Sequence, residues 1–272
     1  MSTPIFQPQS DRVVRLAVVG IGGTGSELLS HLTRLHNAQQ ARGSGGLHVA
    51  AFDPDTVSLA NIVRQRYFAS DIGRSKAVTL IERINTTCAL NWEAQSRRLT
   101  KSDLRAGTFD IVISCVDSRR SRNDLRAMLD RTVNIYGEQR PPARVWIDCG
   151  NTQYSGQVVL GTPGSSTLSA RSRRTAVPCV HELHPEIVDQ CLDVLDPPSC
   201  SALEALTHQG LMVNAMTATI AVDLLDELLT TGTVVQHARY FDLRNGTLAG
   251  RATPGAPSPR PRREGAPARM AS

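Results

Sequence analysis

A short apolar run that ends in a glycine-rich turn constrains this chain more than any other feature. The run Val13 to Val19 is mostly apolar, and Gly20-Ile21-Gly22-Gly23-Thr24-Gly25 follows it directly. The next segment, 26–35, has leucines at helical spacing. A buried strand, a tight turn and a helix in this order are typical of the first unit of a doubly wound α/β sheet, where the helix N-terminus faces an anion.

The glycines of this turn favour a phosphate site. Gly20, Gly22, Gly23 and Gly25 lack the Cβ atoms that would hold phosphate oxygens away from the backbone, and we predict that they bind a nucleotide. Taken alone, the glycine pattern favours a dinucleotide such as NAD or FAD, so this alternative stays open at this point.

Strand-like and helix-like segments alternate along the rest of the chain. Strands are predicted at 47–52, 91–99, 109–116, 144–148, 156–161 and 234–242, and helices at 75–84, 121–129 and 210–229. The order predicts a single α/β domain with a Rossmann-like, doubly wound and mainly parallel sheet, extended by antiparallel strands. The boundaries we expect are a flexible N-terminus at 1–12, the domain at 13–250 with a loop at 38–46 and a crossover loop at 162–201, and a disordered basic tail at 251–272.

Charged side chains that follow the glycine turn distinguish between nucleotides. Asp53 comes directly after a predicted strand, where a carboxylate can accept hydrogen bonds from both hydroxyls of a ribose. Arg64 and Lys76 supply two cations, which a departing pyrophosphate needs and a hydride transfer does not. Asp117 follows a later strand at the same sheet edge and can hold Mg²⁺ together with phosphate oxygens. This set of charged residues favours ATP with Mg²⁺. Asp55, Asn61 and Gln65 are the other polar residues that we predict to bind the nucleotide.

Composition limits the classes of partner. The net charge is +5, and the five arginines and one glutamate after Gly250 account for +4 of it. This distribution favours a solvated tail over a surface for specific nucleic-acid binding. The printed sequence has neither an apolar run of about 20 residues nor a signal-peptide pattern, so we expect a cytoplasmic protein with no membrane partner.

The sequence resembles the superfamily of ATP-dependent adenylating enzymes that includes ThiF, MoeB and the ubiquitin-activating enzymes. The resemblance rests on VVGIGGTG, FDPDTVSLANIVRQ, DIGRSK and SCVDS, and it covers 15–160 well. It implies that Asp53 binds ribose, that Asn61, Arg64 and Lys76 contact phosphates, and that Asp117 coordinates magnesium. The implied reaction is attack by the C-terminal carboxylate of a ubiquitin-like or sulfur-carrier protein on the α-phosphate of ATP. The implied partners are therefore a small β-grasp protein and, as is usual in the family, a second copy of the chain in a homodimer.

The segment Pro198-Ser199-Cys200-Ser201 resembles the part of some members that carries a thioester-forming or sulfur-handling cysteine. A cysteine at a helix N-terminus has a lowered pKa, which favours the nucleophilic thiolate. Two interpretations of Cys200 stay open, capture of the acyl group or a small residue in a buried helix. Two upstream segments, Pro178-Cys179-Val180 and His184-Pro185-Glu186, belong to the same resemblance. Together with them, the segment around Cys200 is most similar to ThiF-type proteins of the bacterial PRTRC gene systems. No zinc site is expected, because standard ligand spacings are missing among Cys179, His181, His184, Cys191 and Cys200.

The main prediction is thus an enzyme that activates a small protein through its adenylate. One alternative is an NAD- or FAD-dependent oxidoreductase on a similar fold, which ligand preference would distinguish. Another is a non-catalytic, nucleotide-bound scaffold that recruits a ubiquitin-like protein, which would bind ATP without exchanging pyrophosphate.

Overall fold

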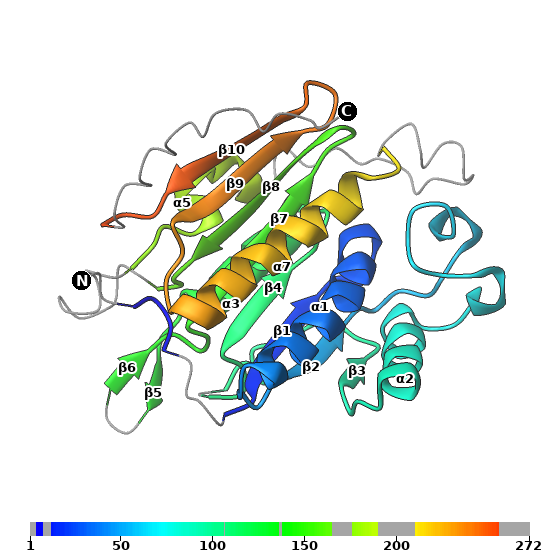
Figure 1. Cartoon of the computed structure of the whole chain (residues 1–272), viewed down its shortest axis with the longest axis horizontal. Helices are drawn as coiled ribbons and strands as arrows, with labels where there is room; N and C mark the ends of the chain where they lie inside the picture. The colour runs from blue at the N-terminus through cyan, green and yellow to red at the C-terminus, as the bar shows by residue number, and fades with distance from the viewer. Residues whose placement is uncertain are drawn as a thin grey trace, which may run out of the picture.

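The fold is built on one mixed sheet, seen here in a computed structural model that describes residues 4–7, 12–105, 107–135, 138–164, 176–189 and 210–255. The strands of this sheet are β1 (Val14–Val19), β2 (Leu47–Phe52), β3 (Glu93–Gln95), β4 (Ile111–Ser114), β7 (Val145–Asn151), β8 (Ser155–Gly161), β9 (Gln236–Asp242) and β10 (Thr247–Ala252). Their order is β10-β9-β8-β7-β4-β1-β2-β3 (Figure 1). The pairs from β3 to β7 are parallel and those from β7 to β10 are antiparallel. The predicted fold class, a parallel sheet extended by antiparallel strands in one domain, is confirmed.

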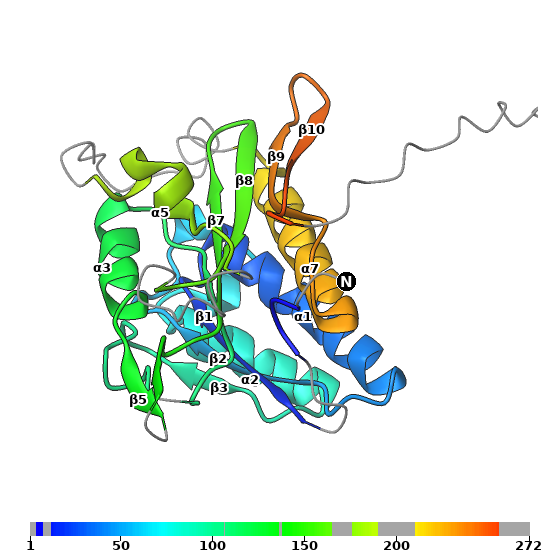
Figure 2. The ribbon, with the colours of Figure 1, turned by 90° about the vertical axis from the view of Figure 1, so that its left-hand side faces the viewer.

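Helices cover both faces of the sheet because its central strands are buried on both sides. The longer helices are α1 (Gly23–Ala41), α2 (Lys76–Cys88), α3 (Arg119–Leu129) and α7 (Val213–Thr231), and α5 (Val180–Leu183) is a short one. Along β1, Leu16 and Val18 belong to the core shared with α1, α2 and α7, whereas Ala17 and Val19 belong to the core shared with α3 and α5. The two layers lie on opposite sides of the sheet in Figure 2.

The strand order creates a natural binding position beside β1. This strand pairs in parallel with β2 on one side and with β4 on the other. In open α/β sheets a ligand binds outside the carboxyl ends of the strands at such a switch point. Gly20, Asp53 and the residues after Ser114 all lie at these carboxyl ends.

Tertiary contacts extend one helix beyond its predicted end. The segment 38–46 is polar and glycine-rich and was predicted to be a loop, but α1 continues to Ala41. The reason lies in α7, which runs beside α1 (Figure 1). The buried side chain of Gln39 donates to Asp226 of α7 at 3.2 Å, and Arg42 pairs with the same carboxylate. The predicted loop is therefore correct only after Ala41.

Several segments differ in detail from the sequence-based expectation. Strand β10 continues to Ala252 and was missed, since its residues are exposed and have no apolar alternation. A second sheet, the hairpin of β5 (Val133–Ile135) and β6 (Glu138–Arg140), was also missed. Phe6 lies in the segment predicted to be flexible, yet it is buried and its N–H donates to Gly232 O at 3.0 Å.

The expected crossover loop contains some regular structure where it is described. Helix α5 and the 3-10 helix η4 (Pro185–Val188) lie within 162–201. The remainder of that segment, including Cys191 and Cys200, lies outside the described residues, as do 256–272 of the predicted tail. Among the described helices, none combines the length and the apolar character that a bilayer span requires.

Candidate nucleotide-binding site

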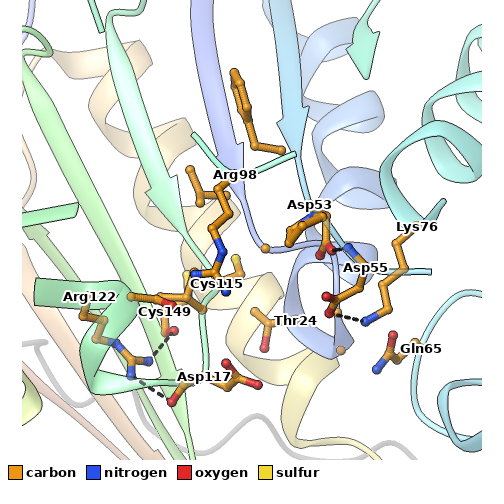
Figure 3. Close-up of a pocket in the computed structure, with 18 of the residues that line it drawn as sticks. Thr24, Asp53, Asp55, Gln65, Lys76, Arg98, Cys115, Asp117, Arg122 and Cys149 are labelled. Atoms are coloured by element: carbon orange, nitrogen blue, oxygen red, sulfur yellow. Dashed lines mark hydrogen bonds and ion pairs between the residues drawn. The ribbon is translucent and has the colours of Figure 1, made fainter. Parts of the chain in front are cut away.

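A pocket of about 500 Å³ opens at the carboxyl ends of β1, β2 and β4, beside the N-terminus of α1 (Figure 3). Most of the residues predicted for a nucleotide site meet in its wall, although they come from segments far apart in the chain. These residues are Gly20, Gly22, Gly23, Asp53, Asp55, Asn61, Arg64, Gln65, Lys76 and Asp117. Gly25 is not part of the wall, and Cys200 lies outside the described residues.

Two glycines of the turn are required by close packing. Gly20 has a φ of +88°, and a Cβ there would lie 2.8 Å from the carbonyl oxygen of Cys115. A Cβ on Gly25 would lie 1.9 Å from the carbonyl oxygen of Gly20. The first glycine therefore allows the turn its left-handed conformation, and the second lets α1 pack directly against that turn. Gly25 thus has a packing reason to be glycine that needs no ligand.

The first turn of α1 presents its backbone to the pocket. Gly22 is the N-cap and gives no side-chain cap, and the first turn of this described helix contains no acidic residue. Gly23 and Thr24 line the pocket. N–H groups at a helix start have no intrahelical acceptor and carry the positive end of the helix dipole. This end of α1 can therefore bind an anion such as a phosphate.

Asp53 fixes the glycine turn and the start of the loop after β2. Its side chain is buried, with 4% of the residue exposed. One carboxylate oxygen accepts the N–H of Ile21 at 2.5 Å, and the other accepts the N–H of Asp55 at 2.8 Å. Burial raises the pKa of Asp53, while these two N–H groups and the charge of Lys76 act in the opposite direction. A carboxylate has about four lone-pair sites, so Asp53 keeps acceptor capacity for a ligand hydroxyl.

Two cations enter the pocket from the loop after β2 and from α2. Lys76 is the first residue of α2, its side chain is 10% exposed, and its Nζ lies 3.0 Å from Asp55, whose side chain is 63% exposed. Burial lowers the pKa of Arg64, and the charge of Asp117 opposes that shift. In Figure 3, Lys76 and Asp55 lie on one side of Thr24 and Asp117 lies on the other. The arrangement suits an extended polyanion that passes over the N-terminus of α1.

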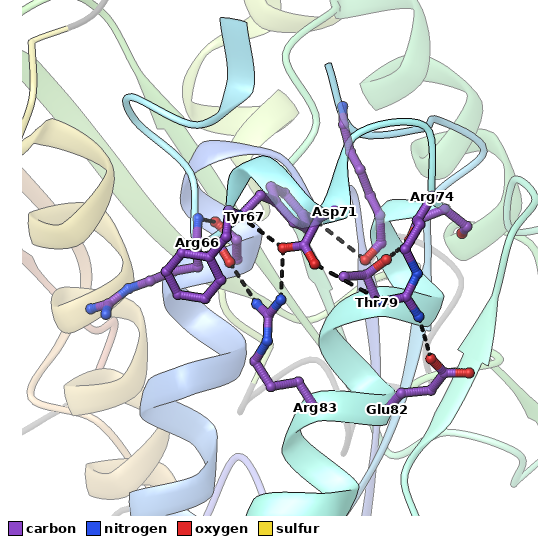
Figure 4. A network of polar contacts seen from close by, with 11 residues as sticks. Arg66, Tyr67, Asp71, Arg74, Thr79, Glu82 and Arg83 are labelled. Atoms are coloured by element: carbon purple, nitrogen blue, oxygen red, sulfur yellow. Dashed lines mark hydrogen bonds and ion pairs between the residues drawn. The ribbon is translucent and has the colours of Figure 1, made fainter. Parts of the chain in front are cut away.

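A network of polar contacts around the buried residues Tyr67 and Asp71 holds this loop in place (Figure 4). The phenol of Tyr67 donates to the carbonyl oxygens of Ile21 at 2.6 Å and of Lys76 at 3.3 Å. Arg83 of α2 donates to Asp71 at 2.6 Å and to the carbonyl oxygen of Arg66 at 3.0 Å. Burial raises the pKa of Tyr67 strongly, so the phenol stays neutral and remains a donor. Tyr67 therefore ties the loop to the glycine turn and to α2 at once.

Removing the hydroxyl group of Tyr67 should loosen the loop, while the ring keeps its packing. In Tyr67→Phe, the buried carbonyl group of Ile21 loses its donor and that of Lys76 loses a longer, shared contact, and we expect the free energy of unfolding to fall by about 1–3 kcal/mol. Chemical denaturation of the wild type and the variant measures this loss. Tyr154→Phe is the matched control, because its half-buried ring keeps its contact with Arg244 and should change stability by less than about 0.5 kcal/mol. Equal stability of Tyr67→Phe and wild type would contradict the role given to the phenol.

Sequence reasoning missed a buried ion pair in the wall of the pocket, to which Arg122 contributes. Arg122 of α3 pairs with Asp148 of β7, with 3.2 Å between Nε and Oδ1, and both residues are buried. The same guanidinium donates to the carbonyl oxygens of Cys149 at 3.3 Å and of Asp117 at 3.4 Å. It therefore joins β7 to the segment that follows β4. The sequence predicts an exposed position for an arginine in a helix as polar as α3. It therefore contains no signal that identifies Arg122 as a buried residue.

Further polar residues line the pocket without having been predicted. Asn151, at the end of β7, donates to Thr24 at 2.9 Å and to Asn214 at 3.1 Å, which joins β7 to the starts of α1 and α7. Arg98 follows β3 and reaches into the pocket in Figure 3. Asn151 comes after the predicted strand 144–148, so the edge rule that identified Asp53 and Asp117 could have found it. Arg98 could not be found in this way, because it lies within the predicted strand 91–99 and the observed strand β3 ends at Gln95.

The pocket also has an apolar part. Its members come from β1, β2, the chain after β3 and β4, and α3, and they are Val19, Phe52, Leu99, Val116, Leu125 and Met128. A planar heterocycle fits such a lining, whereas phosphates fit the charged part. For a metal, Asp117 and Asp124 both line the pocket, and the described residues contain no group of three or more His, Cys, Asp or Glu. This donor set fits Mg²⁺, which is held by one or two carboxylates together with substrate phosphates.

The fold and the pocket define a doubly wound α/β domain with a helix N-terminus at its switch point that can accept an anion. The model of the ThiF family matches residues 9–261, and the chain belongs to this family. The chain is 30% identical over 171 residues to ubiquitin-like modifier-activating enzyme 5 of Caenorhabditis elegans, and the match covers 57% of this chain and 36% of that enzyme. It is 28% identical to the SUMO-activating enzyme subunit uba-2 of the same organism, with 57% and 25% covered. The chain thus spans roughly a third or less of these curated relatives.

Solved structures share the fold at lower identity. MccB of E. coli, solved with ATP, superposes with a TM-score of 0.56 at 14% identity, over 90% of this chain and 65% of MccB. PaaA superposes with a TM-score of 0.55 at 15% identity, over 88% of this chain and 64% of PaaA. These similarities support the fold alone. The chemistry of the site has to be inferred from the residues of the pocket.

Proposed function

We propose that this protein is an ATP-dependent activating enzyme that adenylates the C-terminal carboxylate of a small ubiquitin-like protein. The observation that carries the proposal is that Arg64 and Lys76 lie in the wall of one pocket with the N-terminus of α1 and with Asp117. An NAD site needs the helix N-terminus and a carboxylate such as Asp53, but it does not need two further cations. Release of pyrophosphate does need them.

The two parts of the pocket match the parts of ATP. The adenine would lie against the apolar lining around Phe52, Leu99 and Met128, and the ribose hydroxyls would reach Asp53. The phosphates would pass over the N-terminus of α1 toward Arg64 and Lys76. Asp55 would hold the Lys76 ammonium in position before the nucleotide binds, because Lys76 Nζ lies 3.0 Å from the Asp55 carboxylate. The phosphates would then pair with the same ammonium.

In the proposed reaction, a carboxylate oxygen of the partner forms a bond to the α-phosphorus. The bond between that phosphorus and the oxygen that bridges to the β-phosphate breaks, and its electron pair leaves with pyrophosphate. Arg64 and Lys76 stabilise the charge that develops on the leaving group. Asp117, with Asp124 nearby, would hold Mg²⁺, which neutralises phosphate charge when bound.

The comparisons support the proposal at the level of class. Two relatives carry the names of activating enzymes for ubiquitin-like proteins, and the structural neighbour MccB was solved with ATP. The segment PSCSALEAL supports a narrower assignment to the ThiF-type proteins of PRTRC systems, in which the partner is a β-grasp protein. A homodimer and a cytoplasmic location are further parts of this proposal.

An exchange assay tests the proposed activity. The purified chain is incubated with ATP, Mg²⁺, labelled pyrophosphate and a β-grasp protein encoded beside it, and incorporation of label into ATP is followed. The same β-grasp protein with an amidated C-terminus is the control, because it lacks the carboxylate that attacks. In parallel, Mg-ATP should raise the melting temperature whereas NAD should not. Thermal protection by NAD alone would support the oxidoreductase instead, and ATP binding without exchange would support the scaffold.

A separate prediction concerns Cys200. If its thiol captures the activated acyl group, Cys200→Ala should leave the exchange reaction unchanged and abolish a thioester between chain and partner that reducing agent cleaves. Non-reducing electrophoresis of the reaction mixture measures this adduct. The exposed Cys88 provides the control, since Cys88→Ala should retain the thioester. An adduct that persists in Cys200→Ala would remove this cysteine from the mechanism.

A further inference from the structure

Two cysteines lie side by side in the wall of the pocket. Cys115 directly follows β4, and Cys149 lies in β7. These strands are parallel neighbours in which Ser114 pairs with Asp148, so Cys115 and Cys149 are the next pair in register. Such partners point to the same face, on strands about 4.8 Å apart. That spacing lies within the range of about 4.4–6.8 Å between Cα atoms that a disulfide requires. Figure 3 shows both side chains at the pocket.

The two thiols have different environments. Cys115 is half-buried, whereas Cys149 is buried. The pKa of Cys149 is raised well above its usual value, first by its hydrogen bond with Cys115 and then by burial. A reagent that enters the pocket therefore meets Cys115 first. Once the sulfur of Cys115 is bonded to the reagent, Cys149 is the neighbouring thiol in register and can act as the resolving thiol.

We propose that Cys115 and Cys149 form a dithiol modification site, which a low-molecular-weight disulfide of the glutathione class converts to an intramolecular disulfide that closes the nucleotide pocket. The Cys115 thiolate attacks the external disulfide, forms a mixed disulfide and releases one thiol. Cys149 then loses its proton, attacks the sulfur of Cys115 and releases the second thiol. The two protein thiols are oxidised by two electrons, and the external disulfide is reduced to two thiols.

The position of the pair explains why its oxidation affects the pocket. The carbonyl oxygen of Cys115 packs against Gly20, and the N–H of Cys115 donates to the carbonyl oxygen of Val19 at 2.8 Å. Arg122 binds the carbonyl oxygens of Cys149 and Asp117 together. A backbone adjustment that accompanies the covalent bond would therefore be passed to both the glycine turn and the segment that carries Asp117. The loss of nucleotide binding rests on the proposed function, whereas formation of the disulfide does not.

Peptide mapping after oxidation tests the site. The reduced full chain is incubated with oxidised glutathione, free thiols are then alkylated, and the digest is analysed by mass spectrometry. We expect a cross-linked peptide pair containing Cys115 and Cys149, and we expect excess Mg-ATP to slow its formation. The exposed Cys88 reports that the reagent is active, because it should form only a glutathione adduct. Cys149→Ser should stop the reaction at the mixed disulfide on Cys115, and Cys149→Ala serves if that variant does not fold.

Nucleotide binding is then compared in the reduced and the oxidised chain. The oxidised chain should bind ATP more weakly by about tenfold or more, with recovery after reduction. Modification of Cys88 without a Cys115–Cys149 cross-link would overturn the dithiol site. A cross-link that leaves ATP affinity unchanged would overturn closure of the pocket. A reduced chain that binds no ATP would contradict the proposed function instead, and the cross-link would still decide the site.

Discussion

Arg64→Ala and Lys76→Ala are each expected to lower the rate of ATP–pyrophosphate exchange by about 10²–10³-fold, the range found when one group that stabilises transition-state charge is removed. Both side chains face the pocket from the loop after β2 and from the start of α2, where water is partly excluded. Charge stabilisation is strong in such surroundings because the local dielectric constant is low. The measurement is the exchange rate at saturating ATP and partner protein.

Matched controls separate this effect from a general loss of positive charge. Arg66 lies two residues from Arg64, but its side chain pairs with Glu27 outside the pocket. Lys101 is exposed and also lies away from the pocket. Arg66→Ala and Lys101→Ala should keep exchange within about threefold of wild type, since exposed charges far from the phosphates contribute little. Full exchange activity in both pocket variants would refute the phosphate roles of Arg64 and Lys76.

Asp148→Leu is expected to lower the free energy of unfolding by about 3–5 kcal/mol, because it leaves the buried guanidinium of Arg122 without its counter-charge. Asp148 also accepts the hydroxyl of Ser114 at 2.7 Å, so a second buried donor loses its acceptor. Denaturant titration followed by circular dichroism measures the loss. The variant should also bind ATP less well, since Arg122 holds the carbonyl oxygen of Asp117.

Two comparisons show whether the buried charge is the cause. Arg97→Ala breaks the surface pair with Asp103, where the arginine side chain is 47% exposed, and should cost no more than about 1 kcal/mol. The double variant Arg122→Met with Asp148→Leu removes both charges and should be more stable than Asp148→Leu alone. A double variant that is no more stable than the single one would show that the loss comes from packing instead.

Local sequence was sufficient wherever one short segment determines a feature. Strand β2 ends before Asp53 as predicted, and α2 begins at Lys76 after the capping side chain of Ser75. The chain adopts a left-handed backbone conformation at the end of β1, which favours glycine, and the sequence has Gly20 there. Because the carboxyl ends of parallel strands meet at one edge, the rule that polar residues follow these strands placed Asp53 and Asp117 in one pocket.

Features that depend on distant partners could not be predicted in the same way. Helix α1 passes its predicted end because α7, nearly 200 residues later, supplies Asp226 for Gln39 and Arg42. The ion pair of Arg122 and Asp148 and the contact of Cys149 with Cys115 depend on the register of β4 against β7. Neither pair has a local pattern, since each member alone is an ordinary charge or an ordinary apolar residue.

The sequence by itself determined the class of this protein: the alternation of strands and helices, the glycine turn, and the identity of the cations and carboxylates at the binding edge. Hydrophobic periodicity and backbone requirements act over a few residues, so they can be read along the chain. Only the tertiary structure decided which side chains stand next to each other in the pocket wall, such as Arg98 beside the apolar lining, Asn151 against Thr24, and the two thiols of β4 and β7. The physical reason is that pairing and packing energies depend on distances between segments, and those distances exist only after the sheet has formed.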